Sequence, residues 1–74
     1  MNNPLTRLAE VVNVALNDAG LSENAASKRT GIPRSTLKSR LVTGNFRYGE
    51  LWAIADVLQT TPSKLQAQAE KRAA

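Results

Sequence analysis

Residues 21–44, LSENAASKRTGIPRSTLKSRLVTG, decide the fold of this chain. The stretch opens with Ser22, whose hydroxyl can accept a hydrogen bond from the free amides at the start of a helix. A short helix is then expected over about residues 23–30. Gly31 ends that helix, because glycine readily adopts the left-handed backbone conformation that a sharp turn needs. Ile32 is expected to fill the space beneath the turn.

A second short helix is predicted to start at Pro33 or Arg34. Proline cannot continue the preceding helix but suits the first turn of a new one, where its missing amide hydrogen would have no partner in any case. The helix continues to about Val42. Within it Leu37 and Leu41 lie four residues apart, which places both side chains on one inward face.

Apolar residues also recur at helical spacing on both sides of this stretch. Before it, spacings of three and four predict a helix over about residues 4–19, which Gly20 closes. After it, a helix is expected over about residues 48–58. Trp52 belongs to that helix and is expected in the core rather than as a platform on which bases stack.

A chain of 74 residues is long enough for one ordinary domain. We therefore treat residues 1–74 as a single compact all-α domain of five helices, with a helix-turn-helix over about residues 22–43. The fifth helix opens at Pro62, and a helical tail over about residues 62–74 has little to bury beyond Leu65. That tail either frays in solution or lengthens against a second subunit, so monomer and homodimer both stay open.

The composition excludes several kinds of chemistry. The chain has no Cys and no His, which rules out disulfides, zinc sites built on those residues, thiol nucleophiles and histidine acid–base catalysis. Its six carboxylates show no metal-binding or nucleophile motif, so we expect no enzyme activity, cofactor, metal or small-molecule substrate. The sequence contains no apolar run of membrane-spanning length, so we expect no membrane association and a cytoplasmic location.

Positive charge is concentrated in the middle of the chain. The formal net charge is +4, yet residues 24–49 contain six Lys or Arg and no Asp or Glu, whereas the rest contains four basic and six acidic residues. Clustered charge of one sign raises the local potential and attracts a polyanion such as nucleic acid. The alternative is a solvated basic face without a partner.

Several residues stand in the order and spacing of a known motif. They are Leu21-Ser22, Ala26, Ser27, Gly31-Ile32, Arg34-Ser35-Thr36-Leu37, Gly44, residues 51–58 and residues 61–65. On these residues the chain resembles the Cro/C1-type (lambda-repressor-like) helix-turn-helix family over roughly residues 5–66. Taken together, the motifs are more specific than any one of them alone.

The chain departs from that family pattern in three places. Glu23 stands where members often have Gln, and a carboxylate cannot donate a hydrogen bond to a phosphate. Thr30 and Arg40 occupy positions that are usually apolar, while the apolar residue appears at Leu41. The second helix of the pair is therefore expected to be rotated, or about one residue longer than is usual in the family.

The resemblance implies that this helix enters the major groove of double-stranded DNA. The residues that would read bases lie at its start and on its outer face: Arg34, Ser35, Thr36, Lys38 and Ser39. Arg34 suits a bidentate contact to guanine. The residues at the edges, which suit phosphate contacts, are Lys28, Arg40, Asn45 and Arg47.

Some of these assignments have alternatives. Arg34 could hold a phosphate instead of reading a base. Ser35 and Ser39 could simply be solvated. Arg40 could fold back toward Glu50 or lie in solvent, and Lys28 and Arg29 have the same ambiguity.

The leading functional prediction is a sequence-specific transcriptional regulator, similar to a Cro-like repressor of a phage or bacterium. It would act in the cytoplasm of a bacterium, or of the host cell if a phage encodes it. The alternative is a protein-interaction module of the same fold, such as the antitoxin of a toxin–antitoxin pair or an accessory factor in recombination. The helical tail is the feature that favours a protein partner.

Overall fold

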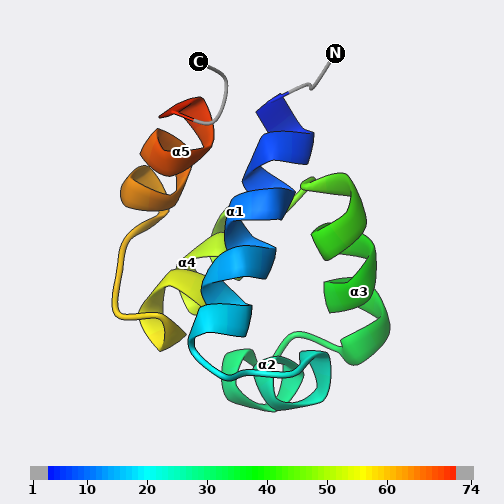
Figure 1. Ribbon diagram of the computed structural model, residues 1–74. Coiled ribbons are helices and arrows are strands. Elements are labelled where there is room, and N and C mark those ends of the chain that lie inside the picture. Colours follow the sequence, from blue (N-terminus) through cyan, green and yellow to red (C-terminus); the bar gives the residue numbers. More distant parts are fainter. Residues whose placement is uncertain (1–3, 72–74) are drawn as a thin grey trace.

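The computed structural model describes residues 4–71, in which all regular secondary structure is α-helical. The helices are α1 (Pro4–Asp18), α2 (Glu23–Thr30), α3 (Arg34–Thr43), α4 (Tyr48–Val57) and α5 (Pro62–Lys71), as Figure 1 shows. The predicted all-α domain of five helices is confirmed, with each described boundary within about one residue of its expected place. Residues 1–3 and 72–74, at the ends of the predicted domain and tail, lie outside the described residues.

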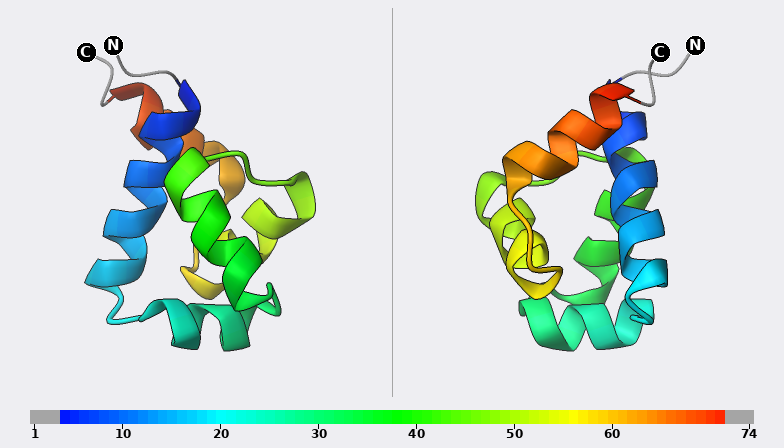
Figure 2. Two further views of the ribbon diagram at one scale, coloured as in Figure 1. Left: turned by 90° about the vertical axis from the view of Figure 1, so that its right-hand side faces the viewer. Right: turned by 60° about the vertical axis from the view of Figure 1, so that its left-hand side comes forward.

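The hydrophobic core is formed by side chains from all five helices. The largest fully buried side chains are Val12 of α1, Leu37 of α3, Ile54 of α4 and Leu65 of α5, and Ala26 of α2 is also fully buried. Helix α1 packs against α3 on one side and α5 on the other, while α2 packs against α3 and α4 (Figures 1 and 2). Burial of each large apolar side chain stabilises the fold by about 1.5–3 kcal/mol.

The turn between α2 and α3 is built by the predicted residues. The hydroxyl of Ser22 accepts from the amide of Ala25 at 3.2 Å, which caps α2. Gly31 ends α2 at φ +78°, and its amide donates to the carbonyl of Ser27 at 2.9 Å. Ile32 is 6% exposed, so it fills the space beneath the turn as expected. Helix α3 begins at Arg34, which settles the choice that the sequence left open.

The hydroxyl of Thr30 makes two hydrogen bonds at the end of α2. It donates to the carbonyl of Ala26 at 2.7 Å and accepts from the amide of Ile32 at 3.2 Å. This polar side chain therefore links the turn to α2. Thr30 is half-buried, and its hydroxyl acts both as a hydrogen-bond donor and as an acceptor.

The expectation that Trp52 lies in the core is wrong, because this side chain is 44% exposed. Helix α4 buries Leu51, Ile54 and Ala55 on one narrow face. Trp52 lies about 100° around the helix from Leu51, beyond the edge of that face. Its ring instead packs edge to face against Tyr48, with ring centroids 6.2 Å apart.

The tail buries few side chains, as its sequence predicts. In addition to Leu65, α5 buries Ala69, which is 6% exposed. In the right-hand view of Figure 2, the end of α5 meets the first turns of α1. The other described residues after Leu65 are exposed, so the expectation that the tail has little to bury beyond Leu65 is confirmed for residues 66–71.

Two backbone contacts fix the carboxyl end of α3 against α1. Gly44 ends α3 at φ +77°, and a side chain at this position would overlap the carbonyl group of Leu5. Asn13 of α1 donates from Nδ2 to the carbonyl of Leu41 at 2.9 Å, and also to the carbonyl of Ala9 at 2.8 Å. The first contact leaves no room for a Cβ, and the second satisfies a carbonyl near the end of α3.

The close approach at Gly44 can be measured against a matched glycine. Gly31 has a similar positive φ, but a Cβ there would meet nothing within 4 Å. We expect Gly31→Ala to lower the free energy of unfolding by about 1–2 kcal/mol, the cost of the left-handed conformation alone. Gly44→Ala should cost roughly 1–3 kcal/mol more, because Leu5 must move. Urea denaturation of both variants tests this, and equal losses would mean that Leu5 is not crowded.

Candidate nucleic-acid interface

Helix α3 presents a polar outer face. Its inner side is fixed by Leu37, which is fully buried, and by Leu41, which is 8% exposed. Ser35 and Ser39 then point the opposite way on a helical wheel. Figure 2, in its left-hand view, shows α3 lying across the side of the molecule that faces the viewer.

The predicted base-reading residues share this side of the domain. Arg34, Ser35, Lys38 and Ser39 are exposed, whereas Thr36 is half-buried at one margin. The face therefore offers hydroxyl groups in its middle and positive charge beside them.

Exposed polar residues flank both ends of α3. Lys28 and Arg29 lie in the last turn of α2, just before the turn into α3. Asn45 and Arg47 lie in the segment that follows α3, and all four side chains are exposed. Arg29 was not singled out from the sequence as a phosphate ligand. Its exposure next to Lys28 adds it to the candidates.

Arg40 folds back toward Glu50, which is one of the two orientations that the sequence left open. Its Nε donates to Glu50 Oε1 at 2.9 Å, and the two side chains are 21% and 17% exposed. The same oxygen accepts the amide of Arg47 at 2.9 Å, at the start of α4. One carboxylate thus joins α3 to α4 and balances one of the six positive charges of the basic stretch.

The electrostatics of Glu50 reflect these contacts. Burial by itself would raise the pKa of this carboxyl group. The hydrogen bond from the Arg47 amide, the hydrogen bond from Arg40 and the two positive charges outweigh burial, so the pKa lies below its ordinary value. Glu50 therefore remains ionised at neutral pH and holds Arg40 in place.

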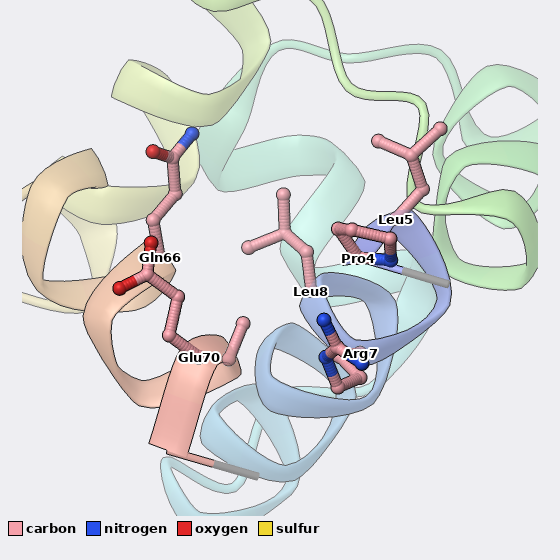
Figure 3. A pocket seen from close by; sticks show the side chains of 7 residues that line it. Pro4, Leu5, Arg7, Leu8, Gln66 and Glu70 are labelled. Atoms are coloured by element: carbon pink, nitrogen blue, oxygen red, sulfur yellow. The ribbon is translucent and has the colours of Figure 1, made fainter. Parts of the chain in front are cut away.

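A separate pocket lies between α1 and α5 (Figure 3). Its volume is about 230 Å³, and its lining is Pro4, Leu5, Arg7, Leu8, Gln66, Ala69 and Glu70. This is below the 300–1,000 Å³ that is typical of small-molecule sites. All of its lining residues belong to α1 or α5, and none belongs to α3. The pocket and the outer face of α3 are therefore independent features.

Residues 4–71 show neither a metal site nor a membrane-spanning helix. No three acidic side chains in this range are grouped closely enough to hold a metal ion. No helix in the same range combines the length and the apolar character needed to cross a membrane. Comparisons of the chain with protein-family models, curated proteins and solved structures found no match. The argument for a nucleic-acid interface therefore depends on the residues of α3 and its flanks alone.

The Arg40–Glu50 contact should make stability depend on pH. Because the pKa of Glu50 is lowered on folding, its contribution is present at neutral pH and is lost as the pH falls through that lowered pKa. We expect Glu50→Gln to lower the free energy of unfolding by roughly 1 kcal/mol at pH 7. As the pH is lowered from 7 toward 3, the difference from the unmodified chain should shrink.

Denaturation at both pH values checks this expectation. Asp56→Asn is the matched control, since it removes an exposed carboxylate from the same helix without touching Arg40. A loss in Glu50→Gln that is the same at pH 7 and pH 3 would show that the charge of Glu50 is not what stabilises this junction.

Proposed function

We propose that the chain is a sequence-specific double-stranded DNA-binding regulator of transcription, similar to a Cro-like repressor of a phage or bacterium. The observation that carries the proposal is the outer face of α3. It is exposed, it has hydroxyl groups at its middle, and exposed cations lie at both of its ends. The same arrangement supports a cytoplasmic site of action, where DNA is accessible.

The shape of α3 suits the major groove. That groove is about 12 Å wide, and an α-helix with its side chains is about 10–12 Å across. Leu37 and Leu41 attach α3 to the core, and the Asn13 and Gly44 contacts fix its carboxyl end. A helix held in this way can enter the groove without first reorganising, which limits the entropy that binding has to overcome.

The proposed contacts are of two kinds, contacts to base edges and contacts to phosphates. Base edges would be read by Arg34, Ser35, Lys38 and Ser39, with Thr36 at the margin, and the guanidinium of Arg34 is suited to guanine. Phosphates would be bound by Lys28, Asn45 and Arg47, with Arg29 added. Because Glu50 occupies the Nε of Arg40, a phosphate contact from Arg40 would use its terminal nitrogens.

Repression requires little beyond such binding, because a protein bound over a promoter blocks access to it. A homodimer would place two copies of α3 on half-sites one helical turn apart, and would enlarge the small contact area of one module. Both features fit a repressor. The proposal includes no catalytic step and no cofactor.

A second candidate is a protein-interaction module of the same fold, such as an antitoxin or a recombination accessory factor. The exposed pair of Tyr48 and Trp52 favours it, since aromatic side chains are enriched at protein interfaces. The tail supports it less than the sequence indicates, because Leu65 and Ala69 are already buried against this chain's own core.

The proposal is tested by selecting random double-stranded DNA with the purified chain at near-physiological salt and sequencing what is retained. We expect enrichment of one motif, whose symmetry would report whether one or two subunits bind. If no motif is enriched and all binding vanishes as salt rises, the proposal fails and the protein-interaction module is favoured.

Arg34→Ala and Arg47→Ala should then have different effects on the selected DNA. Arg34→Ala should lose about 1–3 kcal/mol of discrimination at one base pair and little elsewhere. Arg47→Ala should weaken binding to all sequences similarly, and should reduce the salt slope by about 0.9. Binding titrations against single-base variants at several salt concentrations measure both quantities.

The control is Lys64→Ala, which removes an exposed cation from α5, a helix that packs against α1 and α4. It should leave both sequence preference and salt slope nearly unchanged. Uniform weakening by Arg34→Ala would assign Arg34 to a phosphate, and an unchanged slope for Arg47→Ala would remove Arg47 from the interface.

A further inference from the structure

Val42 is an apolar side chain on an otherwise polar face. It is 73% exposed, although it belongs to the second half of α3. Its position is three residues after Ser39 and four after Lys38, so the three side chains form one stripe along the outer side of the helix. Ser35 extends the same stripe by one turn toward the start of α3.

Nothing in the fold requires valine at this position. Val42 is absent from the core, and β-branched residues are weaker helix formers than the straight-chain residues usual at exposed positions. Its neighbours on the stripe are two hydroxyl groups and an ammonium group. What Val42 offers is one small apolar contact among polar groups.

The major groove presents a matching feature. Base edges there are donors and acceptors, except at thymine, whose C5-methyl group projects into the groove. We propose that Val42 contacts a thymine methyl group and so makes the chain prefer thymine at one position of its DNA site. This inference rests on the proposed function and names a specificity-determining residue within the same interface.

Helix geometry sets where that thymine lies. Seven residues separate Ser35 from Val42, which corresponds to about 10 Å along the helix axis. Successive bases of one strand are about 3.4 Å apart along DNA. A helix that follows the groove therefore places Val42 about three base steps from the base pair nearest Ser35.

The test uses uracil, which differs from thymine only by lacking the methyl group. Each thymine of the selected DNA is replaced by uracil in turn, and the affinity of the full chain is measured for every duplex. One replacement, about three base pairs from the position that responds to Ser35→Ala, should weaken binding by about fourfold, the effect of one buried methyl group. In Val42→Ala the same replacement should weaken binding by less than about twofold.

Val14→Ala is the matched control, because Val14 is also an exposed valine, 44% exposed on α1. It should keep the fourfold response to uracil. Circular dichroism and thermal unfolding check that both variants fold, which we expect because neither side chain belongs to the core.

The outcomes separate the two proposals. If a motif is selected and Val42→Ala keeps the full response to uracil, or no thymine in the site responds to uracil at all, Val42 reads no methyl group, and sequence-specific binding stands without it. If no DNA motif is selected, the proposed function itself fails, and this inference is overturned with it.

Discussion

The burial of Leu37 is the constraint on which the rest of the domain depends. This side chain has no exposed surface, and it sits at the middle of the inner side of α3. Because residues two positions away on a helix point to the opposite side, its burial determines that Ser35 and Ser39 face outward. The hydrogen bond from Asn13 to the Leu41 carbonyl and the close approach of Gly44 to Leu5 then hold the far end of the helix. The candidate interface is thus a consequence of how the core packs.

Much of the fold follows from local signals. The ends of α2 and α3 are marked by Ser22, Gly31 and Pro33. Each of these residues acts on the backbone next to it and needs no distant partner. The sequence does not predict features that depend on residues far away in the chain. Trp52 is apolar and close to the buried face of α4, but only the positions of α2 and α5 determine how wide that face is. The crowding at Gly44 depends on Leu5, which is far away in sequence, so no local pattern could reveal it.

The candidate interface also combines features that the sequence predicts with features that depend on distant residues. The outward direction of Ser35 and Ser39 could be predicted from helical spacing alone, and the charge of the middle stretch from counting residues. The partner of Arg40 could not be chosen, since Glu50 is ten residues away across a loop whose path the sequence does not determine. The ion pair with Glu50 neutralises one of the positive charges near the candidate interface, and it joins α3 to α4. Helical spacing alone places Val42 near Ser39 on the outer side of α3. Its large exposure depends on the positions of the neighbouring helices.

The central claim is that the outer face of α3 is the surface that contacts DNA. The most direct measurement is an NMR titration of the isotopically labelled chain with the DNA that it selects, following the backbone amide shift of each residue. The account predicts that the largest changes fall on α3, on the end of α2 and on the segment that leads into α4, with small changes along α5. Changes concentrated around Trp52, or in the pocket between α1 and α5, would contradict it.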